Sequence, residues 1–313
     1  MQQLQQLALP PLPVPNLGYA CLNQTLRLRK PTIFSGRECR KRTFERRGLV
    51  HVSQLALANC IDLLKIVQWN HEHGIRLFRV SSNMFPWASA YHLDDLPDFA
   101  AACDALAAVG QLARSYGQRL TSHPSHFVQL AAQDESLVQS SLRDLEVQSQ
   151  IFDLMGFAPS HWNKINIHVG GAYGDKPGTL LRFARSVDRL SADCRARLTV
   201  ENDDRDTMFS TSDLLPLHDW TGVPLVFDFH HHKFCAGLLS EAEALEASLA
   251  TWPQGIRPIV HWSESQEGRK PHAHSDLIMG PMCLHGREAE VDVMVEAKHK
   301  ELAVIEFQRI MAL

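Results

Sequence analysis

The sequence predicts an α/β fold, a TIM (β/α)8 barrel with a metal cluster at the C-terminal rim of its strands. Eight short apolar segments alternate with segments of helical spacing across 313 residues, which suits a barrel of about 250 residues plus insertions. Six of these segments end in His, Glu or Asp, and barrel enzymes place their chemistry at that end of the strands. A doubly wound open sheet is the alternative, but the sequence lacks the glycine-rich phosphate loop that such a sheet would carry after its first strand.

The expected elements alternate along the chain. The expected strands comprise residues 17–22, 76–82, 119–122, 164–169, 197–201, 224–228, 257–261 and 291–296. The expected helices comprise residues 50–73, 98–116, 135–155, 179–190, 212–218, 240–250 and the chain that follows the last strand. Residues 16–313 are therefore expected to form a single barrel domain, preceded by a disordered leader, residues 1–15, that is rich in Gln, Leu and Pro.

The composition limits the classes of protein that the chain can represent. Seven scattered cysteines without a Cys-x-x-Cys pair predict reduced thiols in a cytoplasmic protein, and they argue against a disulfide framework or a zinc knuckle. No apolar run reaches about 18 residues, so no membrane span is expected. The first fifteen residues contain no Lys or Arg and so lack the charged start of a signal peptide.

One segment is strongly basic, although the whole chain has a net charge of −4. Residues 25–47 contain nine Lys or Arg against two Glu, a local excess of seven positive charges. The segment is either a solvated loop, as most charge runs are, or a contact with a phosphate backbone, because concentrated cations release counterions from DNA. The charge pattern alone favours neither interpretation.

Ionisable residues at the strand ends indicate metal binding. The candidates are His123, His168, Glu201, Asp228 with His230 or His231, His261, His274 and Glu296. One such histidine alone would be a hydrogen-bonded core residue, but structural histidines have no common reason to occupy one rim. Mixed imidazole and carboxylate ligands suit Mn, Zn or Fe better than a pure Ca or Mg site. Eight ligands imply two or three ions that share bridging carboxylates.

An ordered series of motifs runs from residue 17 to residue 301. It comprises Leu-Gly-Tyr-x-Cys-x-Asn at 17–23, Ser-Ser-Asn-Met-Phe-Pro at 81–86, His-Pro at 123–124, His-Val-Gly-Gly at 168–171, Glu-Asn-Asp-Asp at 201–204, Asp-Phe-His-His at 228–231, Val-His-Trp-Ser at 260–263, His-Ser-Asp at 274–276 and Val-Glu-Ala-Lys-x-Lys-Glu at 295–301. In these residues the chain resembles the UV damage endonuclease family.

The resemblance implies a metal-dependent DNA repair endonuclease that acts on damaged double-stranded DNA without a nucleotide cofactor. Such enzymes nick the strand immediately 5′ of cyclobutane pyrimidine dimers, 6-4 photoproducts and some abasic sites. A cluster of two or three ions, most commonly Mn, is implied, and a monomer associated with the nucleoid is expected. The implied metal ligands are His123, His168, Glu201, Asp228, His231, His261, His274 and Glu296.

The resemblance also decides a choice that strand geometry leaves open, and it assigns further roles. Alternation along a strand would pair Asp228 with His230, whereas the Asp-x-x-His pattern of the family favours His231. Glu201 is expected to bridge metal ions and to act in catalysis with Lys298 and Lys300, which would bind phosphate unless they are solvated surface lysines. The residues expected to contact the lesion are Tyr19, Asn23, Asn83, His126 and Phe127, with ordinary packing as the alternative for Tyr19.

Three positions depart from the family pattern. His126-Phe127 stands where members often carry a Gln-Tyr pair that wedges into the duplex; Phe127 retains stacking worth about 1–3 kcal/mol per base. Ile259 replaces a Lys that some members carboxylate to assist the metals. Asn83, a poorer ligand, stands where some members have His. The first departure leaves the lesion preference open.

Three other functions are compatible with such a barrel. An apurinic/apyrimidinic endonuclease of the endonuclease IV type would differ in its relative rates on abasic and dimer substrates. A metal-dependent sugar isomerase or epimerase also carries His, Glu and Asp on its rim, but it needs no cationic segment such as residues 25–47. A non-catalytic DNA-binding or metal-storage barrel would not need a full ligand set.

Overall fold

The computed structural model describes residues 16–266, 268 and 271–311. The expected leader, residues 1–15, lies outside the described residues. All eight expected strands are present. They are β1 (Leu17–Ala20), β2 (Leu77–Val80), β3 (Arg119–Ser122), β4 (Ile165–Ile167), β5 (Leu198–Glu201), β6 (Leu225–Val226), β7 (Ile259–Trp262) and β8 (Asp292–Val295).

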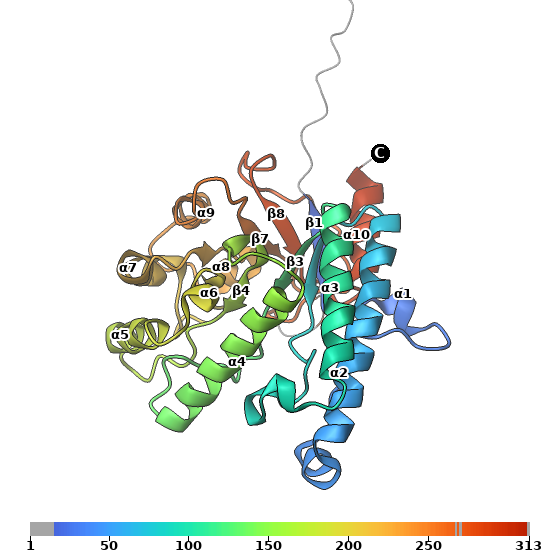
Figure 1. Cartoon of the computed structure of the whole chain (residues 1–313). Helices are drawn as coiled ribbons and strands as arrows, with labels where there is room; N and C mark the ends of the chain where they lie inside the picture. Colours follow the sequence, from blue (N-terminus) through green and yellow to red (C-terminus); the bar gives the residue numbers. More distant parts are fainter. Residues whose placement is uncertain (1–15, 267, 269–270, 312–313) are drawn as a thin grey trace, which may run out of the picture.

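The strands form one parallel sheet that closes on itself. Their order is β6-β5-β4-β3-β2-β1-β8-β7. A parallel bridge between Asp228 and His261 joins the two ends of this order, and the His261 N–H donates to the Phe227 carbonyl at 2.9 Å. The predicted (β/α)8 barrel is therefore confirmed, and Figure 1 shows its strands at the centre of the molecule with the helices around them.

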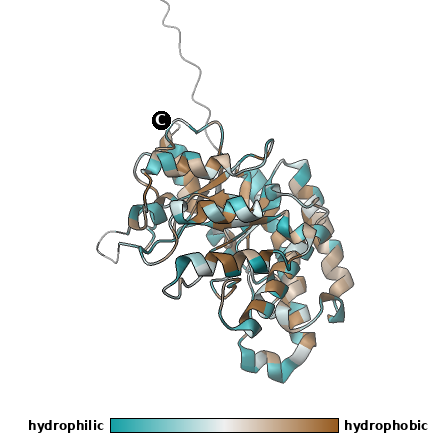
Figure 2. Cartoon of the chain, turned by 90° about the vertical axis from the view of Figure 1, so that its left-hand side faces the viewer, coloured by the Kyte–Doolittle hydropathy of each residue, from teal (hydrophilic) through white to brown (hydrophobic). Residues whose placement is uncertain are grey.

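Helices cover the outside of the barrel after every strand except β7, whose connection to β8 has no helix among its described residues. The helices are α1 (Gln24–Arg27), α2 (Lys41–Glu72), η1 (Ala88–Ala90), η2 (Leu93–Asp95), α3 (Phe99–Ser115), α4 (Glu135–Leu154), η3 (His161–Asn163), α5 (Lys176–Val187), α6 (Ala192–Arg195), α7 (Thr211–Thr221), α8 (Phe229–Phe234), α9 (Glu241–Ala250) and α10 (Glu301–Met311). Figure 2 shows apolar strands inside and mixed or hydrophilic helix surfaces around them, as the burial of apolar side chains requires.

Several expected boundaries differ from the observed ones by two or more residues, and two of these differences affect the description of the fold. The first long helix, α2, begins at Lys41 rather than residue 50, and it is interrupted at Gly48, whose φ of 63° is not helical. The sixth strand ends at Val226, and the residues after Asp228 form helix α8 instead of a loop. The cause is a cap: the Asp228 carboxylate accepts a hydrogen bond from the His231 N–H at 2.8 Å, which starts the helix.

The basic segment is not a single loop. It comprises most of α1, the connection to α2 and the first turns of α2. Eight of its nine cations are exposed to solvent: Arg27, Arg29, Lys30, Arg40, Lys41, Arg42, Arg46 and Arg47. The ninth, Arg37, is half-buried and pairs with Asp62 at 2.6 Å. Most of the positive charge therefore faces solvent.

Among the described residues, α2 alone is long and apolar enough to cross a membrane by length and composition. Half of its most apolar window is buried inside the fold, against which α2 packs beside α3 (Figure 1). A helix of the protein core passes the same test, so this observation is weak support for a membrane span.

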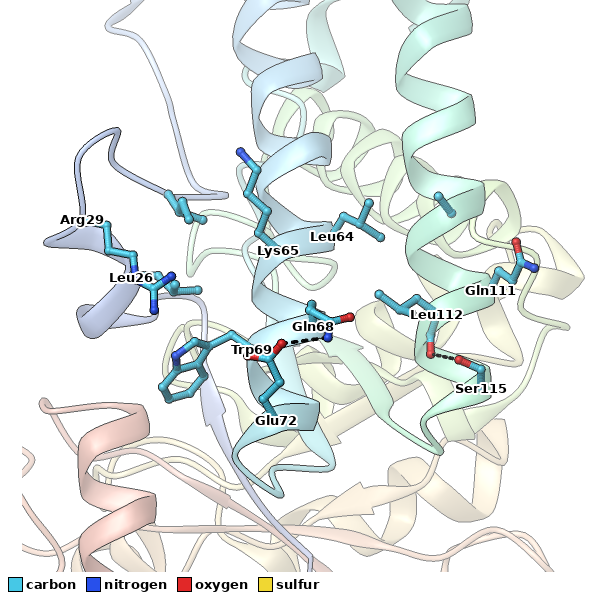
Figure 3. A pocket seen from close by; sticks show the side chains of 12 residues that line it. Leu26, Arg29, Leu64, Lys65, Gln68, Trp69, Glu72, Gln111, Leu112 and Ser115 are labelled. Carbon is cyan, nitrogen blue, oxygen red and sulfur yellow. Dashed lines mark hydrogen bonds between the residues drawn. The ribbon is translucent and has the colours of Figure 1, made fainter.

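A groove of about 640 Å³ lies on the outer surface between α1, α2 and α3. Figure 3 shows Leu26 and Arg29 on one side of it, Lys65 and Gln68 on α2, and Leu112 on α3. None of the candidate metal ligands lines this groove. It is a feature of helix packing on the outside of the barrel.

The N-terminal end of the barrel is held by buried charges. The Asp292 carboxylate, at the start of β8, lies 3.0 Å from the guanidinium of Arg119 on β3 and 3.0 Å from that of Arg257. Asn16 donates a further hydrogen bond to the same carboxylate at 2.9 Å. Asp292 and Arg119 are both 1% exposed, so each depends on its partner for solvation.

We expect Asp292→Ala to lower the free energy of unfolding by about 3–5 kcal/mol, because it leaves the Arg119 guanidinium buried without its carboxylate. Denaturant titration of the wild type and the variant measures this difference. Glu306→Ala, which removes the partner of Arg309 in an exposed pair on α10, is the control and should change stability by less than about 1 kcal/mol. Equal effects of the two substitutions would contradict the prediction.

Candidate metal centre

The centre of the site is the Glu201 carboxylate at the end of β5, which is 1% exposed. Its Oε2 atom lies 3.3 Å from His123 Nε2, 3.2 Å from His261 Nδ1 and 3.9 Å from His168 Nε2. Its Oε1 atom lies 3.2 Å from His231 Nδ1. Four imidazoles from different βα units thus surround one carboxylate, because barrel closure brings the C-terminal ends of their strands together.

Backbone oxygens hold three of the histidines in one tautomer. The Nδ1 atom of His123 lies 3.0 Å from the Pro124 carbonyl oxygen. The Nδ1 atom of His231 lies 2.8 Å from the Asn202 carbonyl oxygen, and that of His274 lies 2.6 Å from the Glu296 carbonyl oxygen. A carbonyl accepts only, so each Nδ1 carries the proton and leaves a lone pair on Nε2. This is the arrangement that protein partners impose on metal-ligating imidazoles.

His168 and His261 complete the imidazole set in different ways. His168 Nδ1 lies 3.1 Å from the Asp203 carboxylate, so its Nε2 also faces Glu201. His261 faces the site with Nδ1 instead, 3.2 Å from Glu296 Oε1 and 3.9 Å from Asp228 Oδ2. The site therefore extends from Glu201 through His261 to two further carboxylates.

The structure brings all eight predicted ligands into one group. The last member, His274, comes from the long β7–β8 connection, and its Nδ1 lies 4.0 Å from Glu296 Oε2. His230, which strand alternation favoured, turns away and lies 3.3 Å from the His272 carbonyl. His231 faces the site, and His230 does not, because a helix starts at Asp228. In this helix His231, the third residue after the cap, points towards Glu201.

The donor set fits divalent cations. Two triads have ligand atoms within 4.8 Å of one another: His123, His168 and Glu201, and Glu201, Asp228 and His261. Glu201 belongs to both, as a bridging carboxylate would. Asp228 Oδ2 and His261 Nδ1 are buried without a hydrogen-bond partner among the described residues. Buried polar atoms without a hydrogen-bond partner are costly unless a cation or a proton satisfies them.

Two buried basic side chains belong to this site, and sequence reasoning missed both. Arg79 is charged, whereas burial lowers the pKa of the Lys164 amine to about 7. Lys164, just before β4, lies with its Nζ 3.3 Å from His261 Nε2, on the side of the ring opposite Glu201. Arg79 on β2 forms an ion pair with Glu296. A charged residue inside or beside an otherwise apolar strand, as in Leu-Phe-Arg-Val, was the available signal.

Two amides that hold the carboxylates were also missed. Asn166 on β4 donates to Glu201 Oε2 and accepts from the Thr199 hydroxyl at 2.8 Å. Asn202 exchanges two hydrogen bonds with the Asp228 backbone, at 2.8 and 3.0 Å. Such bonds to the partners of the ligands fix where the carboxylates point.

Burial and neighbouring charges move the pKa values of the site in opposite directions. Although burial opposes ionisation, the surrounding imidazoles hold the pKa of Glu201 well below its usual range. Burial raises the pKa of Asp228 to about 7, and it lowers that of His261 to about 4. Against burial, Glu201 and Asp203 raise the pKa of His168 to about 9. Such divergent titration is typical of functional sites.

The predicted lesion residues lie in two different environments. His126 and Phe127 are exposed, Phe127 by 69%, on the β3–α4 connection at the rim. Tyr19 and Asn23 are instead buried and bonded to each other at 2.9 Å, with the Tyr19 hydroxyl donating to Asn70. Tyr19 thus packs in the core, which is the alternative that the sequence left open.

The remaining predicted residues lie around the ligand group. Asn83 is partly exposed and donates to Glu38 at 2.9 Å, so it does not face the carboxylates of the site. Lys298 donates to the side chain of Gln266. Lys300 is half-buried just before α10, and burial lowers the pKa of its amine.

Comparison with known proteins identifies the family of this chain. The family model of UV-endonuclease UvdE matches residues 15–313. The chain belongs to this family. It is 41% identical over 315 residues to the UV-damage endonuclease of Schizosaccharomyces pombe, covering 95% of this chain and 51% of that protein. It is 32% identical over 259 residues to the UV DNA damage endonuclease of Bacillus velezensis, covering 79% and 78%.

Solved structures agree with the family assignment. The crystal structure of SacUVDE superposes with a TM-score of 0.80 at 28% identity, covering 95% of this chain and 98% of that one. Endonuclease IV from Thermus thermophilus superposes with a TM-score of 0.56 at 18% identity, covering 80% and 93%, and so shares the fold. The chain spans about half the length of its two fungal relatives, from S. pombe and Neurospora crassa.

In protein freed of metal by a chelator, we expect His261 to make the fold sensitive to acid. Its folded pKa of about 4 lies below the unfolded value of 6.5. The resulting stability is present above pH 6.5 and is lost as the pH falls through about 4, on the order of 3 kcal/mol.

Urea unfolding at pH 7 and at pH 4 measures this loss. The wild type should lose more free energy of unfolding between the two pH values than His261→Gln, which carries no titratable ring. Parallel losses in the two proteins would contradict the assignment to His261.

Proposed function

We propose that this chain is an endonuclease that hydrolyses the DNA phosphodiester immediately 5′ of UV photoproducts, with the help of bound metal ions. Cyclobutane pyrimidine dimers and 6-4 photoproducts are its proposed substrates, together with some abasic sites. The family supplies the broad activity, since its curated relatives are named UV-damage endonucleases. The observation that carries the metal-assisted step is the Glu201 carboxylate, which lies within 4 Å of four imidazoles, three of which line a cavity of about 550 Å³.

The proposed cofactor is a cluster of two or three divalent ions, with Mn as the first choice and Zn, Fe or Mg as alternatives. The residues that would hold it are His123, His168, Glu201, Asp228, His231, His261, His274 and Glu296. When bound, such ions supply Lewis acidity, lower the pKa of water and offset charge on the phosphate.

The chain's own groups prepare the site for that cofactor. Asn166 fixes one Glu201 oxygen, and the carbonyl partners of His123 and His231 leave their Nε2 atoms free. Arg79 keeps Glu296 ionised: against the effect of burial, its charge holds the pKa of this carboxyl far below the usual range. These fixed positions mean that few side chains must reorganise when the ions bind.

DNA would lie across the rim, where the chain offers positive charge and exposed aromatic surface. The exposed cations of residues 25–47 are the proposed contacts to the phosphate backbone, because they are not engaged in the core. Lys298 and Lys300 are proposed to bind phosphate near the scissile bond. Lys298 would then give up the hydrogen bond that it donates to the Gln266 side chain. A monomer acting on one duplex is the proposed working form.

The proposal is tested with purified protein, Mn²⁺ and an end-labelled duplex that carries one thymine dimer. We expect a single nick directly 5′ of the dimer, with a 3′-hydroxyl and a 5′-phosphate. A matched duplex with one abasic site separates this activity from that of a general abasic endonuclease, which would cleave the abasic duplex faster. No cleavage beside the dimer by metal-loaded protein would overturn the proposal.

Glu201→Gln should reduce cleavage at the dimer by at least about 100-fold, because it removes the charge that both ligand triads share. It should also lower the metal content per chain, measured by elemental analysis. Glu72→Gln, on the exposed C-terminal end of α2, is the matched control and should retain both properties. Full activity of Glu201→Gln would contradict the metal mechanism.

Phe127→Ala should lower the ratio of cleavage at a dimer to cleavage of undamaged duplex by roughly 10-fold, through loss of one base-stacking surface. The unfolding midpoint should not change, since the ring is 69% exposed. Phe127→Trp keeps an aromatic face and should preserve the ratio. If the alanine variant retained wild-type selectivity, Phe127 would not act as a wedge.

A further inference from the structure

His274 differs from the other candidate ligands in how the fold places it. The other seven stand at or just after the ends of barrel strands or in the short helix α8, so closure of the barrel brings them together. His274 instead comes from the long connection between β7 and β8. It pairs with Ser265 in an antiparallel bridge, beside which the Gln266 N–H donates to the Ala273 carbonyl at 2.7 Å. Other contacts are needed to hold this short ladder over the rim.

Main-chain hydrogen bonds fix the ladder to the chain that follows β8. The Lys298 N–H donates to the Ser275 carbonyl at 3.0 Å, and the His299 N–H donates to the Asp276 carbonyl at 3.0 Å. Both bonds involve residues that follow His274. The chain just before His274 contacts α8 and the β5–α7 connection instead.

One face of α8 supports His274. His230 and Phe234 lie four positions apart and therefore share a face of the helix. The ring of His230 packs steeply inclined against that of Phe234, with centroids 5.1 Å apart, and against that of His274, with centroids 5.2 Å apart. His231 lies on another face and points towards Glu201. The same short helix thus supplies one candidate ligand and supports a second.

His272 connects this face of α8 to the wall of the metal centre. Its ring is stacked on that of Phe234, with centroids 4.0 Å apart and planes inclined by 27°. Its Nδ1 lies 3.0 Å from Oδ2 of Asp204, and because a carboxylate only accepts, Nδ1 donates. Asp204 belongs to the β5–α7 connection and lines the cavity over the candidate ligands. The His272 carbonyl also lies 3.3 Å from His230 Nε2, so one residue links the β7–β8 connection to two neighbouring elements.

We propose that His272 is a positioning residue of the metal centre, which holds the ligand His274 beside Glu296 through its contacts with α8 and Asp204. The inference rests on the metal-assisted step of the proposed function. Without these contacts, residues 272–274 would gain conformational freedom, and an ion would bind only after that freedom is lost again. Removal of a partner that orients a metal ligand typically lowers metal affinity by about 10–100-fold.

Titration of Mn²⁺ into the full chain, first freed of metal by a chelator, tests the inference, with free Mn²⁺ measured by electron paramagnetic resonance. His272→Ala should weaken the binding of one ion per chain by roughly 10-fold. His272→Asn keeps a donor for Asp204, and His272→Phe keeps a ring against Phe234, so each should bind with an affinity between those of the alanine variant and the wild type. His285→Ala breaks a pair with Glu241 at 2.9 Å in the same connection, and this control should bind Mn²⁺ as the wild type does.

A double variant shows whether His272 acts through His274. His274→Ala removes a ligand and should weaken the same ion more than His272→Ala does. Residues that act through one another have non-additive effects, so the double variant should bind Mn²⁺ as His274→Ala does. A residue that only stabilised the fold would weaken binding further in both backgrounds. The unfolding midpoint of His272→Ala should match that of the wild type, since the side chain is 44% exposed.

Three outcomes would overturn the inference: His272→Ala binds Mn²⁺ as tightly as the wild type, neither His272→Asn nor His272→Phe recovers affinity, or the losses from His272→Ala and His274→Ala add. In each case a wild type that binds Mn²⁺ leaves the proposed function standing. A wild type that binds no Mn²⁺ would remove the metal-assisted step, and the role of His272 with it.

Discussion

The structure depends on one buried carboxylate that several imidazoles share. Glu201 is held at the end of strand β5, and four histidines from other βα units approach it: His123, His168, His231 and His261. A carboxylate buried in this way would destabilise the barrel unless cationic groups surrounded it. The bridge that closes the barrel joins Asp228 to His261, so closure of the fold and assembly of the site use the same residues.

The two ends of the barrel contain different arrangements of buried charged residues. At the N-terminal end, Asp292 lies between Arg119 and Arg257. The ion pairs of its carboxylate with both guanidinium groups connect β8 to β3 and to the residues before β7. At the C-terminal end, the Arg79 guanidinium pairs with Glu296, and the amine of Lys164, whose pKa burial lowers to about 7, lies beside His261. Arg79 offsets part of the acidic charge of the site. Asp228 Oδ2 and His261 Nδ1 are still buried without a hydrogen-bond partner among the described residues.

The rim outside this site carries the groups that the proposed contact with DNA would use. His126, in the exposed dipeptide of His126 and Phe127, lines the cavity over the metal centre, and the exposed cations of residues 25–47 extend along α1 and the start of α2. Cations for the phosphate backbone, an exposed aromatic face and a deep ligand group are features that the proposed recognition of a lesion by base extrusion would use.

The barrel and the presence of His, Glu or Asp at the ends of its strands could be predicted from the sequence, because a buried strand and the polar residue that ends it are local patterns. Tertiary structure alone decided that Lys164 and Arg79 lie beside the candidate ligands, that Tyr19 is buried, and that α8 begins at Asp228. The choice of His231 over His230 followed from family resemblance, and the structure gives its cause in that helix. Which side chains meet is fixed by barrel closure over long sequence separations, and local periodicity carries no information about those contacts.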